Sequence, residues 1–280
     1  MMRPSMKFTR ALALACLLAS GALIAGCATT GGREPTANAL AVIIAGSHRS
    51  AADRSRDRYR HPEETLLFFG IRPNERVLQV WPESGWYTKI IAPLVRAKGG
   101  YLAGVMTPDP GSRFLQERSA NYRRLLASRP DLYGSVKVAA FPLDGGDVVP
   151  PGSVDMVLSF RDLHEWMALG DAQQALATIY RALAPGGVFG VVDNRGDPGV
   201  PQDPRAKSGY VRQDYAIRMI EAAGFRLVAT SEVNANPMDT KSYPAGVWTL
   251  PPDYRLGNID RGRYEGIGES DRFTLKFVKP

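Results

Sequence analysis

The chain has 280 residues, of which 44% are hydrophobic and 22% are charged, and its formal net charge is +7. This length is enough for one well-packed domain of an ordinary globular protein. The two cysteines are too few for a disulfide framework, and no run of five like charges argues for nucleic-acid binding.

The first 26 residues are typical of a secretion signal. Arg3, Lys7 and Arg10 form a basic head, and residues 11–26 are apolar, rich in small residues and too short to span a membrane. Removing this leader lowers the net charge from +7 to +4, because it carries three basic residues and no acidic ones. It also removes one cysteine, so Cys27 is the single cysteine left.

The leader ends in Ile24-Ala25-Gly26 before Cys27, which resembles the lipobox of bacterial lipoproteins. The resemblance implies cleavage before Cys27 and lipidation of its thiol. Ala28 follows instead of an aspartate, which implies an anchor in the outer membrane, facing the periplasm. The alternative is a plain secretion signal with a chance cysteine. We expect a leader over 1–26, a tether over 27–35 and one domain over 36–280.

Helical segments are expected before the first strand. Thr36 is expected to cap a helix over 37–45, and the charged residues 48–60 predict an exposed helix whose charges pair with one another. Pro62 is typical of a helix start, and that helix is expected to end near Gly70.

The central stretch of the chain reads as a strand, a turn and a helix. Residues 76–80 form an apolar run of strand length, residues 81–85 contain turn-forming Pro82 and Gly85, and helical spacing begins at Trp86. A doubly wound α/β domain opens with such a unit. Its turn is where these domains seat a ligand, although any α/β domain contains one.

Strands and helices alternate through the rest of the chain, which predicts an α/β fold with a parallel sheet. Asp171 is the expected N-cap of one helix. Residues 185–187 are expected to form the turn between that helix and the fifth strand. The further strands are predicted over 101–106, 136–140, 154–159, 188–193, 225–230 and 273–278, and the helices over 113–128, 171–183 and 210–223.

The order of these elements, and the turn residues between them, resemble those of the class I, S-adenosylmethionine-dependent methyltransferases. The resemblance rests on Ser153-Val154-Asp155-Met156-Val157 and on Leu183-Ala184-Pro185-Gly186-Gly187. It is closest to a group of predicted, often secreted or lipidated methyltransferases, through Trp86-Tyr87-Thr88, His164-Glu165-Trp166 and Glu269-Ser270-Asp271-Arg272. It implies a Rossmann-like, doubly wound sheet of about seven strands, with the last strand antiparallel and a helical extension at the N-terminus.

The resemblance also implies an S-adenosylmethionine site, with departures from the family pattern. The family strand usually ends in an acid, and its loop has glycine at alternate positions because a missing Cβ lets backbone N–H groups approach the ligand. Asp109 is the nearest substitute for the acid that binds the ribose, and Asp144 matches the acid that meets the adenine amino group. The implied cofactor residues are Gln79, Trp81, Glu83, Gly85, Asp109 and Asp144.

His164 is the candidate catalytic residue, because it follows the fourth strand, where this fold faces the methyl acceptor. Its ordinary pKa of about 6.5 suits a general base. The alternative is that it only hydrogen-bonds its loop. Asp193 and Asn194 either line the same cleft or cap a neighbouring helix. The three histidines lack metal-ligand spacing, so no metal site is expected.

Residues 232–271 form a connection of about forty residues, rich in proline and aromatic residues. Connections of this length are usually functional or disordered, and the aromatic residues favour an ordered cover over part of the sheet. Asn234, Asn236 and Asp239 either present polar groups to a substrate or form turns, and we favour turns.

Three functions remain open from the sequence. The first is methyl transfer from S-adenosylmethionine to a small or envelope-associated acceptor. The second is a non-catalytic ligand-binding lipoprotein with a degenerate methyltransferase fold. The third is a structural lipoprotein of the envelope. The expected partners are a small-molecule or envelope acceptor and the membrane through the lipid anchor, and no nucleic acid.

Overall fold

The computed structural model of the protein describes residues 33–107 and 111–280. The predictions made for the leader, for Cys27 and for Asp109 lie outside these residues. None of the helices in the two described ranges is both long and apolar enough to cross a membrane.

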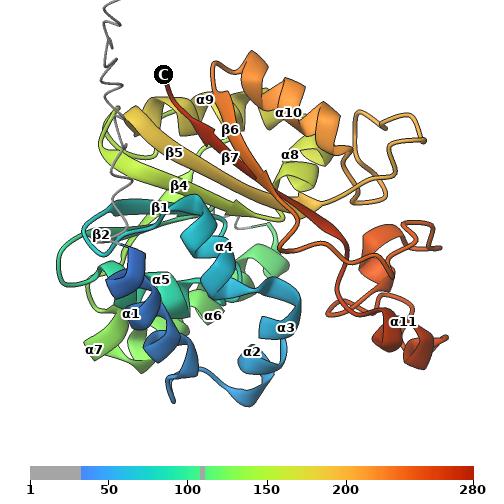
Figure 1. Ribbon diagram of the computed structural model, residues 1–280, viewed down its shortest axis with the longest axis horizontal. Helices are drawn as coiled ribbons and strands as arrows, with labels where there is room; N and C mark the ends of the chain where they lie inside the picture. The colour runs from blue at the N-terminus through green and yellow to red at the C-terminus, as the bar shows by residue number, and fades with distance from the viewer. Residues whose placement is uncertain (1–32, 108–110) are drawn as a thin grey trace, which may run out of the picture.

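One mixed sheet organises the fold, with the strand order β3-β2-β1-β4-β5-β7-β6 (Figure 1). β7 is antiparallel to both of its neighbours, and the other neighbouring strands pair in parallel. The strands are β1 (Arg76–Val80), β2 (Gly100–Met106), β3 (Lys137–Phe141), β4 (Val154–Phe160), β5 (Leu183–Asn194), β6 (Arg226–Ser231) and β7 (Arg272–Val278). The predicted fold class is confirmed.

The chain begins its sheet in the middle, winds outward to β3 and then returns to β4 beside β1. The strand order therefore reverses between β1 and β4. In open α/β sheets, ligands bind in the crevice outside the carboxyl ends of the strands at such a point. This topology places the candidate site next to the loop after β1.

Helices cover both faces of the sheet (Figure 1). One buried cluster joins the sheet to α8, α9 and α10, and the other joins it to α1, α4, α5, α6 and α7. The helices are α1 (Arg33–Ala45), α2 (Ala51–Ser55), α3 (Asp57–Arg60), α4 (Pro62–Phe69), α5 (Thr88–Val95), α6 (Arg113–Ser128), α7 (Pro130–Tyr133), α8 (Leu163–Leu169), α9 (Ala172–Ala182), α10 (Gln213–Ala222) and α11 (Arg261–Ile267).

Several local predictions are corrected. α1 begins at Arg33, so Thr36 lies inside the helix and is buried instead of capping it. Asp171 occupies the N-cap position of α9, but its side chain makes no capping hydrogen bond. Residues 185–187 do turn, with Gly186 at φ +75°, but they lie within the long strand β5.

The predicted exposed helix over 48–60 is wrong. The segment forms two short helices, α2 and α3, and its charges reach the rest of the domain. Arg49 is buried against Asp57, while Asp53 pairs with Lys89 of α5 at 2.7 Å. Charge spacing alone does not distinguish pairs within a helix from pairs with distant residues.

The connection between β6 and β7 is ordered, as its aromatic residues predicted. It contains the 3₁₀ helix η2 (Gly246–Thr249) and α11, and it buries Val247, Leu250 and Tyr264. Asp239 holds it in place by accepting hydrogen bonds from the Tyr210 hydroxyl at 3.0 Å and from the backbone N–H of Asp271 at 2.8 Å.

Candidate functional site

The loop after β1 has a left-handed backbone at three alternate residues. The φ angles are +40° at Trp81, +51° at Glu83 and +74° at Gly85. Only glycine adopts such angles without steric cost, and non-glycine residues in this region gather at ligand sites. The loop thus has the backbone expected of a glycine-rich loop while carrying two large side chains.

Gly85 lies so close to α6 that a side chain would not fit there. A Cβ built there would lie 2.1 Å from Leu125 Cδ2 and 3.3 Å from Tyr122 Cε2, both on α6. The glycine therefore lets the loop pack against α6. Packing against α6 is therefore the role that the structure shows for Gly85.

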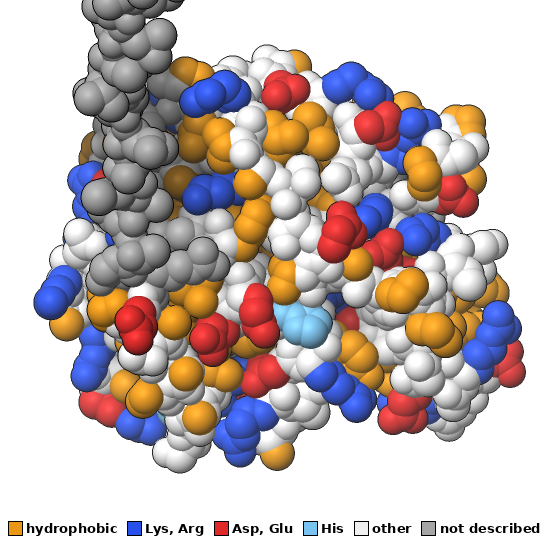
Figure 2. Space-filling view, in the orientation of Figure 1, with side chains coloured by type: hydrophobic (Ala, Val, Ile, Leu, Met, Phe, Trp, Pro, Cys, Tyr) orange, Lys and Arg blue, Asp and Glu red, His pale blue; other side chains and the backbone are white. Residues whose placement is uncertain are grey.

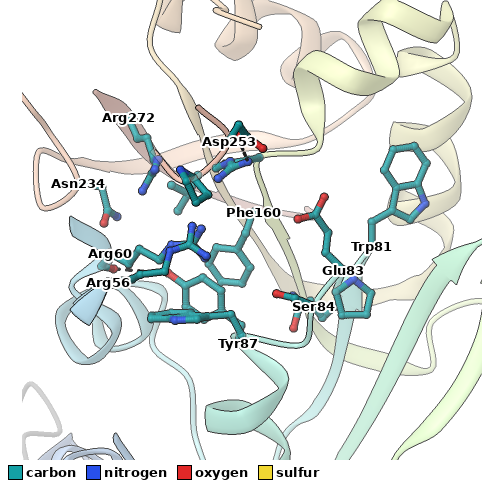
Figure 3. Close-up of a pocket in the computed structure, with 16 residues that line it drawn as sticks. Arg56, Arg60, Trp81, Glu83, Ser84, Tyr87, Phe160, Asn234, Asp253 and Arg272 are labelled. Carbon is teal, nitrogen blue, oxygen red and sulfur yellow. Dashed lines mark hydrogen bonds and ion pairs between the residues drawn. The ribbon is translucent and has the colours of Figure 1, made fainter. Parts of the chain in front are cut away.

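An open cavity lies beside this loop, at the carboxyl ends of β1 and β4, and encloses about 800 Å³ of empty space when the solvent at its mouth is included. Figure 3 shows its two sides: Arg56, Arg60, Asn234 and Arg272 lie on one side and Glu83 on the other, with Tyr87 and Phe160 between them. The Tyr87 and Phe160 rings stack with their centroids 3.5 Å apart.

Gln79, predicted at the end of the first strand, lines the cavity and is 3% exposed. Its Oε1 accepts a hydrogen bond of 2.6 Å from the Tyr101 hydroxyl. The hydroxyl of Thr88 joins Tyr101 at 2.9 Å and Tyr122 at 3.1 Å, so the network fixes the orientation of the amide.

Glu83 also lines the cavity and forms an ion pair of 2.6 Å with Arg118 of α6. Burial raises the pKa of Glu83, but the charges of Arg161 and Arg118 outweigh burial and hold it below its ordinary value. Its carboxylate is therefore ionised at neutral pH. An ionised carboxylate here favours the cationic part of a ligand.

The Trp81 ring is turned away from the other labelled residues in Figure 3. It packs edge-on against Trp166 of α8, with a centroid distance of 6.1 Å, as part of the core. Its indole nitrogen is buried, with no hydrogen-bond partner among the residues the structure describes.

The arginine cluster, defined as Arg56, Arg60, Arg161 and Arg272, is the main charged feature of the cavity. Three of the four pair with Glu269: Arg56 at 2.6 Å, Arg60 at 3.1 Å and Arg272 at 2.5 Å. Burial alone would raise the pKa of Glu269, but the three guanidinium groups hold it well below its ordinary range.

His164 does not reach this cavity. It is 2% exposed on α8, and its Nδ1 lies 2.8 Å from Asp193 Oδ1, while Asp193 Oδ2 accepts the backbone N–H of His164 at 3.2 Å. Asp193 thus caps α8, one of the two roles left open for it. Asn194 is also buried and donates to the backbone oxygen of Gly209 at 2.9 Å. The geometry gives His164 a structural role.

Asp144 is exposed and lies away from the cavity. Its Oδ1 accepts the backbone N–H of Gly146 at 2.9 Å, which is a local turn. It lines neither this cavity nor the smaller one beside it. The structure therefore does not bring Asp144 together with Gln79, Trp81 and Glu83.

The smaller cavity, of about 360 Å³, lies between the end of β2 and α6. Trp81, Pro82 and Glu83 line both cavities, so the two meet at the loop after β1. Much of the smaller cavity's lining is apolar, from Val105, Met106, Leu115 and Tyr122.

The sequence prediction missed the arginine cluster and Glu269. Arg56 and Arg60 lay in the segment interpreted as an exposed helix, and the motif Glu269-Ser270-Asp271-Arg272 was noted without a role. Of the three polar residues in the long connection, Asn234 lines the cavity, whereas Asn236 and Asp239 form turns and ties within the fold. Within the described ranges, no group of three or more His, Cys, Asp or Glu side chains is placed to hold a metal ion.

Comparisons with known proteins show what this fold is similar to. No protein-family model matches the sequence, and no curated protein matches it either. Among solved structures, a SAM-dependent methyltransferase from Aquifex aeolicus is 17% identical, covers 81% of this chain and 93% of its own, and has a TM-score of 0.54.

Two further structures extend the comparison. The [4+2]-cyclase SpnF is 17% identical, covers 89% of this chain and 93% of its own, and has a TM-score of 0.56. The methyltransferase CalH in complex with SAH is 15% identical, covers 82% of this chain and 59% of its own, and has a TM-score of 0.50. Identities this low speak for the fold alone. With its reversal between β1 and β4 and its antiparallel β7, the chain has the fold of the class I, S-adenosylmethionine-dependent methyltransferases.

Proposed function

We propose that the protein is an S-adenosylmethionine-dependent methyltransferase whose donor binds at the loop after β1. The observation that carries the proposal is the left-handed backbone at Trp81, Glu83 and Gly85, beside a cavity at the switch point of the sheet. Non-glycine residues with a left-handed backbone are retained only where the surrounding structure holds them in that conformation. Such residues are concentrated at ligand sites.

The residues that line the cavity fit the polar end of this donor. Asn234 Oδ1 is a buried cavity atom without a hydrogen-bond partner among the described residues, which leaves one acceptor for a ligand's amino group. The fixed amide of Gln79 lines the same cavity, and the Glu83 carboxylate suits a positive charge. The apolar wall of the smaller cavity suits a flat ring.

When bound, S-adenosylmethionine supplies an electrophilic methyl group on a sulfonium. The chain's own contribution is positioning and the exclusion of water. Pro252 and Asp253 of the β6–β7 connection line the cavity, while Tyr87 and Phe160 form its aromatic wall.

The location of the protein is part of the proposal. Cys27 and the apolar leader before it support a lipid anchor at the periplasmic face of the outer membrane. A small-molecule or envelope-associated acceptor would then meet the site outside the cytoplasm.

A second function is favoured by one observation: large side chains occupy two of the three alternate loop positions where the family has glycine. A non-catalytic module that keeps the cavity and binds another ligand would tolerate these replacements. Binding of the donor separates the two functions.

Calorimetric titration of the purified protein with S-adenosylhomocysteine tests the proposal. Gln79→Leu should weaken binding about tenfold or more, because it removes a cavity amide worth about 1–3 kcal/mol when left unpaired. Asp144→Asn, which alters an exposed turn outside both cavities, should leave the affinity unchanged. Equal affinities for both variants would contradict the placement, and no binding to folded wild-type protein would favour the second function.

A further inference from the structure

The arginine cluster carries more positive charge than the protein neutralises. Arg56, Arg60 and Arg272 share one buried carboxylate, that of Glu269. Among the described residues, the acid nearest to the fourth arginine, Arg161, is Asp253 at 3.9 Å, which is beyond hydrogen-bonding distance. Glu83 also acts on Arg161, but it is shared with Arg118, which leaves four guanidinium groups around the carboxylates of Glu269, Asp253 and a shared Glu83. The excess of buried positive charge favours an added anion.

Hydrogen-bond donors of the cluster are also left over. Arg56 donates through Nε to Glu269, while its buried Nη2 has no partner in the described part of the chain. Arg60 likewise uses Nε for Glu269, and its guanidinium lies 4.8 Å from the centre of the Trp86 ring. Arg272, by contrast, is engaged with Glu269, Ser270 and the Tyr59 backbone oxygen.

Arg161 is held at the cavity by a strained backbone. It directly follows β4, has a φ of +70°, and donates its backbone N–H to Val192 at 2.7 Å. A non-glycine residue with this φ has a conformational cost, which functional sites commonly bear. The strain places a cation opposite the loop after β1, on the side of the fold where β4 ends.

The electrostatics agree with this geometry. Burial lowers the pKa of Arg60 to about 10, with Glu269 opposing the shift and the neighbouring arginines adding to it. The pKa of Arg272 is also lowered, first by burial, with Arg161 adding to the shift and Glu269 opposing it. Arg161 differs, because Glu83, Glu269 and Asp253 together outweigh burial and raise its pKa. The repulsion within the cluster therefore falls on Arg60 and Arg272. A bound anion would relieve that repulsion.

We propose that the arginine cluster binds an oxyanion group, a carboxylate or a phosphate, carried by the methyl acceptor. This inference rests on the proposed function and names the class of its substrate. Guanidinium groups match carboxylate and phosphate oxygens with paired N–H donors. The stacked Tyr87 and Phe160 rings line the same cavity and suit the uncharged body of such an acceptor.

The test is calorimetric titration with two probes, inorganic phosphate and succinate, each with and without saturating S-adenosylhomocysteine. One of the probes should bind, and its identity separates a phosphate site from a carboxylate site. Arg161→Met should weaken that binding tenfold or more. Arg226→Met is the matched control, because Arg226 is exposed at the start of the edge strand β6, does not line the cavity, and should leave binding unchanged.

Arg161→Lys provides a second variant in case Arg161→Met does not fold. It keeps the charge and loses the paired donors, so it should bind the probe more weakly than the wild type. Thermal unfolding of each variant checks that the protein is folded.

The outcomes separate this inference from the proposed function. No anion binding, or equal binding by wild type and both Arg161 variants, overturns the inference. Displacement of the anion by S-adenosylhomocysteine assigns the cluster to the donor's own carboxylate, which overturns the acceptor role and leaves the proposed function standing. Anion binding without any S-adenosylhomocysteine binding overturns the proposed function and, with it, the acceptor role. Simultaneous binding of both supports the inference.

Discussion

Trp81 and Glu83 hold a backbone conformation that ordinarily belongs to glycine. Each such residue costs about 1–3 kcal/mol, which other contacts must offset. Trp81 is compensated by burial against Trp166, and Glu83 by its ion pair with Arg118. The loop after β1 therefore keeps a glycine-like backbone through the contacts of two large side chains.

His164 gives the first prediction, on pH. Burial alone would lower its pKa, but the Asp193 carboxylate raises it above the ordinary value of about 6.5. A raised pKa means that the folded state binds the proton more tightly than the unfolded state. The stabilisation is therefore complete below about pH 6.5 and is lost as the pH rises through the folded pKa.

Urea unfolding at pH 6 and pH 8.5 measures this effect. The free energy of unfolding of the wild type should fall by on the order of 1 kcal/mol more than that of His164→Gln between the two values. Parallel pH profiles for the two proteins would show that the pair does not titrate in this way.

Glu269 gives the second prediction. It is the shared carboxylate of three arginines, and Glu269→Gln would leave their charges unneutralised. Removing one partner of a buried ion pair typically costs about 3–5 kcal/mol, so a fall of that size in the free energy of unfolding is expected. Glu265→Gln, an exposed change on α11, is the control and should stay within about 0.5 kcal/mol.

The same carboxylate also has a pH signature. Its pKa is held well below the ordinary range, so its stabilising effect is present above the unfolded value of about 4.3 and is lost as the pH falls further. Glu269→Gln should therefore lose less stability than the wild type on acidification below about pH 4. A variant as stable as the wild type at pH 7 would refute the counter-ion role.

At the scale of elements, the contact between the loop after β1 and α6 fixes the floor of the site. Gly85 allows this contact, and Tyr122 of α6 joins the hydroxyl network that orients Gln79. The ion pair between Glu83 and Arg118 ties the same two elements. The loop and α6 therefore behave as one unit.

The third prediction tests this unit. Gly85→Ala adds a Cβ 2.1 Å from Leu125 Cδ2 at a residue with φ +74°, so strain and overpacking together should cost about 2–4 kcal/mol of unfolding free energy. Gly262→Ala on α11 is the control, because its Cβ would meet no atom within 4 Å, and a helical alanine is neutral or stabilising. Equal stability of the two variants in urea unfolding would contradict the account.

Elements were more predictable from the sequence than the site. β1 and α6 have the predicted bounds, because apolar runs and helical spacing report directly on burial. The arginine cluster was not predictable, because Arg56, Arg161 and the motif at 269–272 come from three parts of the chain and meet only in the fold. The place of His164 in the chain likewise does not reveal that it is buried on α8 and paired with Asp193.

At the scale of the whole molecule, the protein joins a methyltransferase fold to a predicted lipid anchor. On the face shown in Figure 2, Lys and Arg side chains are intermixed with Asp and Glu. The arginine cluster, by contrast, gathers four positive charges inside the cavity. Recognition is therefore expected to occur in the cavity, with the anchor setting only the location.

The fourth prediction concerns that anchor. Cys27→Ser should remove lipid labelling entirely, because the thioether to the lipid requires a sulfur atom. Incorporation of labelled palmitate in cells producing the wild type or the variant measures this. Equal labelling of the two proteins would contradict the lipoprotein assignment.

The central claim is that the loop after β1, despite Trp81 and Glu83, is a working donor site. Hydrogen–deuterium exchange of the purified protein, with and without millimolar S-adenosylhomocysteine, tests it most directly. The account predicts slower exchange at residues 79–88 and at the cavity segments around Asn234 and Asp253, with no change around the exposed turn at Asp144. Unchanged exchange at residues 79–88 in a folded protein would contradict it.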